Sequence, residues 1–252
     1  MFFSKRFKKF ENIHHCFFSR KNGFSKGIYR GLNCGQESSD DKKTVKKNLA
    51  FVAKKIKIDQ KKILLMFQTH SNKVIIIDEK TNKNKQFHSD SIITNLKGFA
   101  LGVVTADCVP VILYDVKNEI IGCVHAGWKG ATSGIIENTL LKFKKLNLNN
   151  KIFASVGPCI GKKSYEVGLS FYKNLISYSR KNSIYFSTKN KNKKFFDLRK
   201  YVADKLKTLN VTVDHVNHDT FAETNNFFSY RRSQKLHEND YGRCISVISL
   251  LK

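Results

Sequence analysis

Short runs of β-branched and other apolar residues, several of them bounded by Gly, Asp or Asn, limit most strongly what this chain can fold into. Several runs are apolar at nearly every position, which is typical of strands buried on both faces of a sheet. They predict strands at residues 74–77, 101–105, 111–114, 120–124, 152–156, 211–216 and 245–249. So many buried strands require a large core, and 252 residues are enough to form one.

Four stretches repeat apolar residues at helical spacing, and we expect these stripes to pack on the sheets. Ser39 and Asp40 can cap the first helix, and Asp197 can cap the third. The stripes are Val45, Leu49, Val52 and Ile56; Val167, Phe171, Leu175 and Tyr178; Leu198, Val202, Leu206 and Leu209; and, within residues 133–146, Ile136, Leu140 and Phe143.

The order of these elements predicts the fold class. Strands and helices do not alternate strictly, and no linker interrupts the hydrophobic pattern. Residues 78–89 and 189–194 are rich in Lys and Asn and predict exposed loops. We therefore expect one α+β domain over residues 1–252, in which mixed β-sheets are flanked by helices.

The charge of the chain is strongly basic, with 46 Lys and Arg residues against 20 Asp and Glu and a formal net charge of +26. Only eight of the basic residues are arginines, and the lysines are scattered along the whole sequence. Proteins that recognise nucleic acid usually concentrate their charge and favour arginine. We expect a basic surface that attracts anionic metabolites and no specific nucleic-acid binding, with a basic nucleic-acid-binding module as an alternative.

The apolar segments predict neither a membrane span nor a secretory leader. The longest, residues 99–114, contains Asp107 and Pro110, and the amino terminus has no continuous apolar stretch. The six cysteines are far apart and include no CxxC pair, so they do not suggest a disulfide framework. We expect a cytoplasmic protein that binds no membrane.

Three short segments at the ends of predicted strands could carry chemistry: residues 68–72 (QTHSN), 105–108 (TADC) and 125–130 (HAGWKG). Their His70, Cys108 and His125 form a ligand set that suits zinc and leaves a fourth position for water or substrate. The same residues allow a metal-free chemistry, in which Cys108 is a nucleophile, His125 its base, and Asp107 orients the imidazole or holds substrate. The residues alone do not separate the two hypotheses.

Two further segments could bind phosphate. Gly127 and Gly130 flank Lys129, where backbone amides beside a lysine can hold an anion; a plain tight turn is the alternative. Near the carboxyl end, residues 227–232 (FFSYRR) put two arginines beside three aromatic rings, which can clamp phosphate and stack a base. An aromatic strand with a solvated charge pair is the alternative there.

Together these segments resemble the YfiH-like laccase-domain family. Its members were formerly described as multicopper polyphenol oxidases and are now described as purine nucleoside phosphorylases with adenosine deaminase and methylthioadenosine phosphorylase activity. The resemblance extends from about His15 to Leu250. Its motifs here are FFSRKNGFSKGIYRGLNCG, QTHSNKV, DSIITNLKGFALGVVTADCVPVILYD, IGCVHAGWKGA, SVGPCIGKKSYEVG and FFSYRRS…GR, which ends at Arg243.

The resemblance implies an α+β fold with zinc bound by His70, Cys108 and His125. It also implies phosphorolysis of inosine, adenosine, guanosine and methylthioadenosine, and hydrolytic deamination of adenosine. We expect Asp107 to handle protons beside Cys108 and His125; a structural aspartate that caps a turn is the alternative. The residues that we expect to contact phosphate or nucleoside are Arg20, Asn33, Lys129, Tyr165, Tyr230 and Arg231.

Two alternative enzyme functions remain open. A copper-dependent phenol oxidase would have only eight histidines, none in an HxH pair. One Cu²⁺ could bind the His₂Cys set with Met66 as an axial ligand, but we expect Met66 to be a core residue. A cysteine hydrolase, such as an amidase acting on cell-wall precursors, would use Cys108 and His125.

Many family members have a Cys-Thr pair before the Tyr-Arg-Arg motif, where this chain has His218-Asp219-Thr220.

Overall fold

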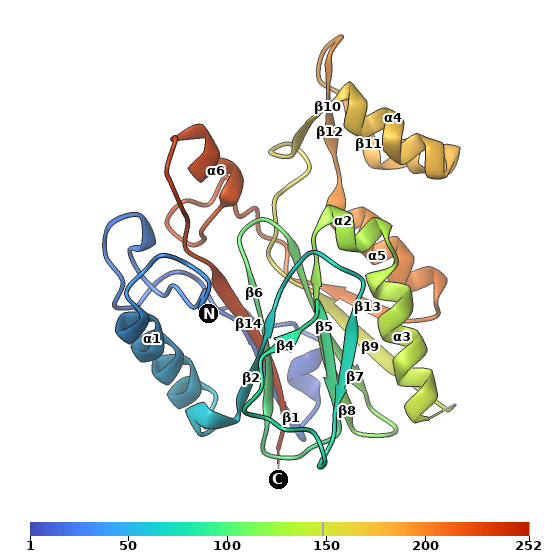
Figure 1. The fold of residues 1–252 in the computed structure, drawn as a ribbon. Coiled ribbons are helices and arrows are strands. Elements are labelled where there is room, and N and C mark those ends of the chain that lie inside the picture. The colour runs from blue at the N-terminus through green and yellow to red at the C-terminus, as the bar shows by residue number, and fades with distance from the viewer. Residues whose placement is uncertain (148, 252) are drawn as a thin grey trace.

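Two large β-sheets pack face to face, with helices on both outer sides, in the computed structural model, which describes residues 1–147 and 149–251 (Figure 1). The first sheet has five strands, in the spatial order β1 (Ile13–Phe17), β14 (Cys244–Leu250), β6 (Ala100–Thr105), β2 (Ile63–Phe67) and β4 (Phe87–His88). The second has six strands, in the order β13 (Thr212–His215), β9 (Ile152–Val156), β7 (Val109–Asp115), β8 (Ile120–Ala126), β5 (Ser91–Thr94) and β3 (Val74–Ile77).

Both sheets mix parallel and antiparallel pairs, which confirms the α+β class. The pairs β2–β6, β3–β5 and β9–β13 are parallel, whereas β1–β14, β14–β6, β5–β8, β7–β8 and β7–β9 are antiparallel. Every residue of β7 and β8 is buried, as their continuous apolar sequences predict. The layer between the sheets contains Leu101, Ile112, Tyr114, Ile121 and Ile248.

The helices cover the outer faces through the predicted stripes. The helix α1 (Lys42–Lys55) packs Val45, Leu49 and Val52 on the five-stranded sheet. The six-stranded sheet is covered by α3 (Ile135–Leu146) and α5 (Leu198–Thr208). Further helices are α2 (Trp128–Thr132), α4 (Leu169–Tyr178) and α6 (Tyr230–Lys235), with short 3₁₀ helices at Phe7–Lys9, Gly27–Tyr29, Gln60–Lys62 and Arg180–Tyr185.

A small sheet and α4 project from one end of the molecule (Figure 1). Its strands lie in the order β10 (Glu166–Gly168), β12 (Lys193–Phe196) and β11 (Phe186–Thr188). The prediction of a loop at residues 189–194 is wrong at its end, because β12 begins at Lys193. Likewise β4 lies within the loop predicted at residues 78–89.

Three predicted helix starts are corrected by the structure. The helix predicted through Val167 begins at Leu169, because Val167 lies in β10. The cap of α1 is Asp41, whose carboxylate accepts hydrogen bonds from the amides of Lys43 and Thr44. Asp40 is not available for capping, because it accepts hydrogen bonds from Ser25 and from Asn33. The helix predicted over residues 133–146 begins at Ile135, since Gly134 adopts a left-handed backbone with φ of 96°.

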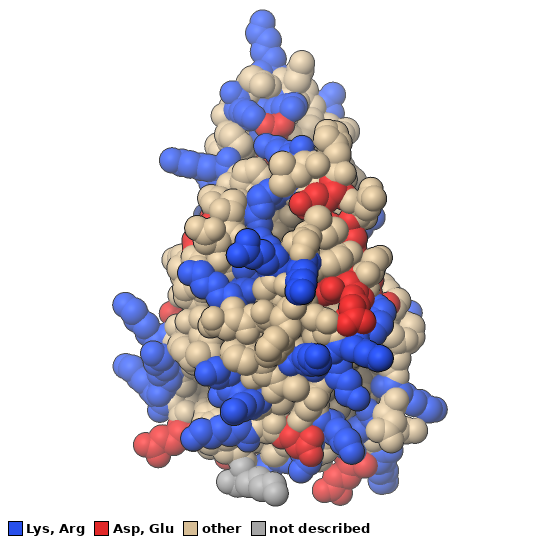
Figure 2. Space-filling view, turned by 90° about the vertical axis from the view of Figure 1, so that its left-hand side faces the viewer, with Lys and Arg blue, Asp and Glu red and all other residues tan. Residues whose placement is uncertain are grey.

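One face of the molecule is basic over wide areas, and no single stripe of charge stands out on it (Figure 2). Figure 2 shows the side of the molecule that lies on the left in Figure 1, with Lys and Arg side chains spread over the whole of that face. None of the helices within residues 1–147 and 149–251 has the length and apolar character needed to cross a bilayer.

Candidate metal centre

Three chain segments bring His70, Cys108 and His125 together at one end of the two sheets. His70 follows β2, Cys108 lies in the turn between β6 and β7, and His125 is the last residue but one of β8. One ligand atom from each residue lies within 4.8 Å of the other two. The Cys108 Sγ is 3.7 Å from the His70 Nε2, and the two imidazole centroids are 4.7 Å apart.

Tight local structure sets these positions. His70 and Asp107 adopt left-handed backbone conformations, with φ of 58° and 87°. The Gln68 side chain exchanges two hydrogen bonds with the backbone of Val104, at 2.8 and 2.9 Å, and so holds the loop that carries His70 against β6. Gly127 provides space, since a Cβ there would lie 2.8 Å from the His70 ring and 2.9 Å from the Cys108 sulfur.

Asp90 connects two of the three residues and was not singled out from the sequence. Its buried carboxylate accepts a 2.8 Å hydrogen bond from His125 Nδ1, which leaves Nε2 as the ligand atom of that ring. It also accepts hydrogen bonds from the amides of His70, at 3.0 Å, and Ser71, at 2.6 Å. Burial alone would raise the pKa of Asp90, but the hydrogen bonds from His125 and Ser71 lower it to about 2.

The charges of Cys108 and His125 support one another. Burial opposes ionisation of both groups, yet their mutual attraction lowers the pKa of the Cys108 thiol and raises that of the His125 imidazole. Asp90 adds to the stabilisation of a charged His125. A thiolate is the form of cysteine that binds a metal or attacks an electrophile.

The donor set fits a zinc ion. One thiolate and two imidazoles are typical ligands of catalytic zinc, which keeps a fourth position open. A carboxylate on the second nitrogen of a ligating histidine, as Asp90 provides for His125, is the usual support for such a ligand. The three residues and Asp90 could therefore hold one metal ion.

Two cavities meet at this cluster. The larger, of about 430 Å³, opens beside His70 and Cys108, and its other lining residues include Asp107, Trp128, Lys129, Tyr165, Tyr230, Arg231 and Tyr241. The smaller, of about 130 Å³, is lined by all three residues of the cluster together with Gly35, Glu37, Gln68, Tyr241 and Arg243. The larger one is within the size range of small-molecule sites in proteins.

Four of the predicted substrate residues line the larger cavity. Lys129 is exposed at the start of α2, and Tyr230 is 46% exposed at the start of α6. The Arg231 guanidinium lies 5.2 Å from the centroid of the Tyr165 ring and donates a 2.6 Å hydrogen bond to the carbonyl of Glu166. The structure therefore brings two cations and two aromatic rings beside the cluster.

Arg20 and Asn33 lie outside both cavities and are engaged in other contacts. Arg20 donates hydrogen bonds to the carbonyl of Arg30 and stacks 4.3 Å above the Phe228 ring. Asn33 is fully buried, and its side-chain oxygen accepts hydrogen bonds from the amides of Gly35 and Arg243. Through these bonds Asn33 holds two residues that line the smaller cavity.

Asp107 is buried and fully hydrogen-bonded. It accepts hydrogen bonds from the hydroxyls of Thr220, at 2.7 Å, and Ser229, at 2.8 Å, and from the Arg231 amide, at 2.7 Å. Burial raises the pKa of Asp107, although these donors oppose the change. Through these contacts the Asp107 carboxylate anchors the turn before Cys108 to the start of α6.

The segment that departs from the family pattern is part of the same network. Thr220 binds Asp107, and Asp219 accepts hydrogen bonds from the Gly161 amide and the Ser164 hydroxyl. The aromatic segment before Arg231 ends in the helix α6, capped by Ser229, so the alternative of a strand there is wrong. The Ser229 hydroxyl contacts both Asp107 and the amide of Arg232, which fixes this helix start.

Three residues of the site were missed from the sequence: Asp90, Tyr241 and Arg243. The Arg243 guanidinium lies 4.2 Å above the Tyr241 ring, which in turn packs 5.1 Å from Tyr230. Tyr241 follows an irregular segment with no apolar periodicity, so no local pattern marks it. Arg243 closes the last quoted motif, which was the available signal for that residue. Asp90 opens the quoted cysteine motif, and that position was the available signal.

Known proteins resemble this chain over nearly its whole length. A protein named purine nucleoside phosphorylase from Haemophilus influenzae is 32% identical over 241 residues, which are 94% of each chain. A purine nucleoside phosphorylase of Rickettsia conorii is 36% identical over 188 residues, 74% of this chain and 77% of the relative.

Solved structures share the fold. A crystal structure of a Neisseria meningitidis protein superposes with a TM-score of 0.84 and 27% identity over 96% of both chains. The Bacillus licheniformis hypothetical protein YfiH superposes with a TM-score of 0.87 and 24% identity over 94% and 92% of the two chains. A family model described as multi-copper polyphenol oxidoreductase laccase matches residues 14–251. The resemblance found in the sequence is thus confirmed, and the chain belongs to the multi-copper polyphenol oxidoreductase laccase family, the YfiH-like family.

Proposed function

We propose that this chain is a zinc-dependent purine nucleoside phosphorylase that also deaminates adenosine. The observation that carries the proposal is the position of the His70–Cys108–His125 cluster, which borders a cavity lined by two cationic groups and several aromatic rings. A purine base needs flat apolar contacts, and phosphate needs cations. The names of the relatives from H. influenzae and R. conorii support the same substrate class.

Zinc is the metal that we assign to His70, Cys108 and His125. When bound, a zinc ion supplies a Lewis acid and lowers the pKa of a coordinated water to about 7. Cu²⁺ competes well for nitrogen and sulfur ligands, so it can occupy the same residues when it is abundant. One three-residue cluster among the described residues gives a single ion position, which does not suit an oxidase that needs several coppers.

The substrate residues divide into those that contact substrate and those that position them. We assign Lys129 and Arg231 to phosphate, and Tyr165 and Tyr230 to the faces of the base. Asp107 positions Arg231 through its amide and stays beside Cys108, where it can also exchange a proton with substrate. Arg20 and Asn33 support the chain around the site rather than touch the substrate in the larger cavity.

We assign two reactions to this site, as the resemblance to the family implies. In phosphorolysis, a phosphate oxygen forms a bond to C1′ of the ribose, and the bond from C1′ to the base nitrogen breaks. The base leaves with the electron pair and takes up a proton. The nucleosides that we propose as substrates are inosine, adenosine, guanosine and methylthioadenosine. In deamination, water adds at the ring carbon that bears the amine of adenosine, and ammonia leaves to give inosine.

The free thiols agree with a cytoplasmic enzyme. All six cysteines are unpaired, five of them buried, and disulfides are rare in a reducing compartment. Burial raises the pKa of the Cys123 and Cys159 thiols, so these cysteines are unreactive core residues. Cys108 is the partly exposed one, and it lines both cavities at the cluster.

The proposal is tested by incubating inosine and phosphate with the purified, metal-analysed protein and measuring hypoxanthine by chromatography. Phosphate-dependent hypoxanthine with one zinc per chain, both lost in Cys108→Ala, is the expected result. A matched control is Cys159→Ala, which removes a buried thiol outside the two cavities and should leave zinc content unchanged. Stoichiometric zinc without hypoxanthine would remove the nucleoside substrate from the proposal.

A cysteine hydrolase is the second candidate, because the Cys108 sulfur lies 3.7 Å from one imidazole and within 4.8 Å of another. It predicts an enzyme that works without metal on amide substrates, and whose Cys108 is protected from alkylation by substrate. Loss of activity on treatment with a chelator, and its recovery with zinc alone, would exclude this mechanism.

A further inference from the structure

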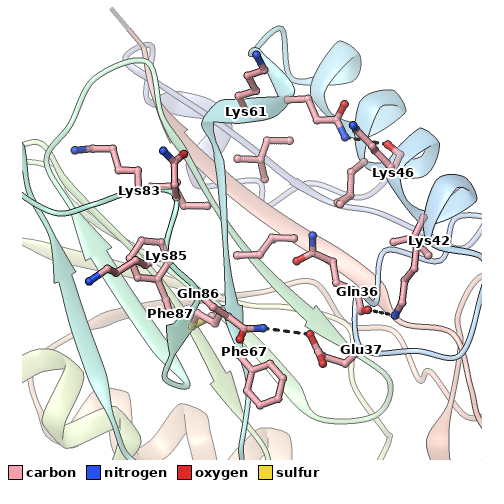
Figure 3. Close-up of a pocket in the computed structure, with 18 of the residues that line it drawn as sticks. Gln36, Glu37, Lys42, Lys46, Lys61, Phe67, Lys83, Lys85, Gln86 and Phe87 are labelled. Carbon is pink, nitrogen blue, oxygen red and sulfur yellow. Dashed lines mark hydrogen bonds between the residues drawn. The ribbon is translucent and has the colours of Figure 1, made fainter.

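A separate cavity of about 680 Å³ lies beside the exposed edge of β2 (Figure 3). All five residues of β2, Ile63–Phe67, line it. Figure 3 shows Lys42 and Lys46 on one side of this strand and residues 83–87 on the other. The cavity is therefore a slot between α1 and the segment before β4, with a strand edge along its floor. Nothing in the proposed nucleoside chemistry uses it.

The edge of β2 is unpaired along much of its length. On one side, Ile63–Leu65 pair in parallel with β6. On the other side, β4 pairs only with Met66 and Phe67, so no described strand pairs with Ile63–Leu65 there. The Ile63 amide bonds the Gln60 carbonyl. Successive residues of a strand direct their N–H and C=O groups to opposite sides, so only alternate residues of Ile63–Leu65 present backbone groups to this edge. Such an edge is a template for another extended chain.

The side chains of β2 alternate in the way that a docked strand requires. Leu64 and Met66 are buried between the sheets, whereas Ile63, Leu65 and Phe67 are half-buried and face the slot or its rim. An added strand would therefore find apolar contacts at every second position. Val45 and Leu49 of α1 extend the apolar lining.

Lysines surround this apolar edge. Lys42 and Lys83 donate hydrogen bonds to backbone carbonyls, but the ammonium groups of Lys46, Lys61 and Lys85 have no hydrogen bond or ion pair among residues 1–147 and 149–251. The acidic residues of the lining are engaged elsewhere: Glu37 accepts a long hydrogen bond from Gln86, and Asp59 accepts one from the Lys61 amide. The free charge of the slot is positive.

This charge selects among the chains that could pair with the edge. Lysines beside an edge discourage a second copy of the same basic chain, because like charges would meet across the new pair. They favour a strand that carries carboxylates. A small anion would use the lysines but neither the strand edge nor the apolar positions, so an extended polypeptide explains more of the lining.

We propose that the slot binds an extended acidic polypeptide segment of a partner protein, which adds a strand beside β2. The segment alternates acidic and apolar residues. Its apolar side chains pack on Ile63 and Leu65, and its carboxylates pair with Lys46, Lys61 and Lys85. Because Gln36, Glu37, Leu65 and Met66 line both this slot and the smaller cavity, the docked strand lies against the wall of the metal centre.

The test uses a fluorescein-labelled heptapeptide of alternating Glu and Val, titrated with the full protein and followed by fluorescence anisotropy. Three further probes are the same peptide N-methylated at every second residue, a Lys/Val peptide and inorganic tripolyphosphate as competitor. We expect binding of the Glu/Val peptide and none of the Lys/Val peptide. N-methylation removes the strand hydrogen bonds and should weaken binding by about tenfold or more.

Charge-reversal variants locate the site. The double variant Lys46→Glu, Lys85→Glu should weaken binding of the Glu/Val peptide by about tenfold or more. The matched control, Lys144→Glu with Lys145→Glu on the exposed side of α3, makes the same change in net charge and should bind the peptide like the original protein. Circular dichroism and zinc content verify that both variants fold. Hydrogen exchange should show protection in residues 63–65 when the peptide is bound.

Three outcomes would overturn the proposal. Equal binding of the N-methylated peptide, or tighter binding of tripolyphosphate than of the Glu/Val peptide, would identify a plain anion site. No binding of the Glu/Val peptide would remove the docking site altogether. Exchange protection at another edge, without protection of residues 63–65, would place the strand elsewhere.

Discussion

Replacing Asp90 by Asn tests whether the carboxylate behind His125 organises the metal centre. Each Asp90 oxygen accepts hydrogen bonds: Oδ1 from His125 and from the His70 amide, and Oδ2 from the amide and hydroxyl of Ser71. An Asn side chain keeps one acceptor oxygen. Its NH₂ group takes the place of the other oxygen and faces the two donors that bound that oxygen in Asp90. The variant therefore loses at least one partner of a ligand-bearing segment and the negative charge beside His125.

The expected loss of zinc affinity follows from these contacts. Removing a partner that orients a ligating histidine typically costs about 10–100-fold in metal affinity, or about 1.4–2.7 kcal/mol. A hydrogen bond to a charged group contributes about 1.5–3 kcal/mol to stability, so the metal-free variant should also unfold more easily. The two effects are measured separately, by competition with a chromogenic chelator and by urea denaturation of the metal-free protein.

A second buried aspartate provides a matched control. Asp115 lies at the end of β7 that is farther from Cys108. It accepts hydrogen bonds from the amides of Lys117 and Lys151 and from the Asn118 side chain. Asp115→Asn should reduce stability by a similar amount while the zinc affinity stays unchanged. If Asp90→Asn binds zinc as tightly as the original protein, or if both variants lose zinc equally, Asp90 acts only in folding and our reasoning is refuted.

Three other variants or conditions give independent tests. Gly127→Ala places a methyl group against the His70 ring and the Cys108 sulfur, so zinc affinity should fall by about tenfold; unchanged affinity would contradict the close approach. Lys129→Ala should raise the KM for phosphate by about tenfold with little change in Tm, whereas Arg20→Ala should lower Tm and leave that KM unchanged; the reverse pattern would exchange their roles. Burial lowers the pKa of His15 to about 4 from an unfolded value of about 6.5, so its neutral form stabilises the fold fully above pH 6.5. This stabilisation, about 3 kcal/mol, is lost as pH falls from 6.5 to 4, because the unfolded chain takes up the proton first. Urea denaturation across this range should show that slope, and His15→Gln should lack it.

Several strands at the centre of the fold could be predicted because buried strands have an apolar composition, although the largely apolar β2 and β5 were missed. The predicted ranges 74–77 and 152–156 coincide with β3 and β9, and the runs in β7 and β8 fall one or two residues short of the observed ends. A strand inside a two-sheet core contacts apolar atoms on both faces, so nearly every residue is apolar. Three of the helical stripes were equally clear, since each packs one face on a large sheet. The fourth was wrong at its ends, because Val167 lies in β10 and Tyr178 is exposed.

Strands that combine polar residues with specific contacts were missed. In β1 the residues between Ile13 and Phe17 include two histidines, which hide the apolar pattern. The structure satisfies both: His15 Nε2 accepts a hydrogen bond from the Ser4 amide, and His14 Nδ1 contacts the Ile56 carbonyl. The small sheet was missed for a related reason, because its strands are short and two lysines hide the apolar character of β12. The Phe196 ring of β12 packs on Tyr165, Phe171 and Tyr201, which come from three other segments. Such contacts come from distant parts of the chain, so no local window contains them.

The pairing of two strands that are distant in sequence would have been enough to predict the position of Asp90 in the candidate site. Strands β5 and β8 are antiparallel, with Ser91 opposite Val124. Continuing that register by one residue brings Asp90 opposite His125, and the His125 amide indeed donates a 2.8 Å hydrogen bond to the Asp90 carbonyl. Pairing of these two strands therefore places the supporting carboxylate beside its histidine without any further information. The motifs that carry the ligands are local and were legible, whereas the residues that hold them in place depend on sheet register, which apolar periodicity does not determine.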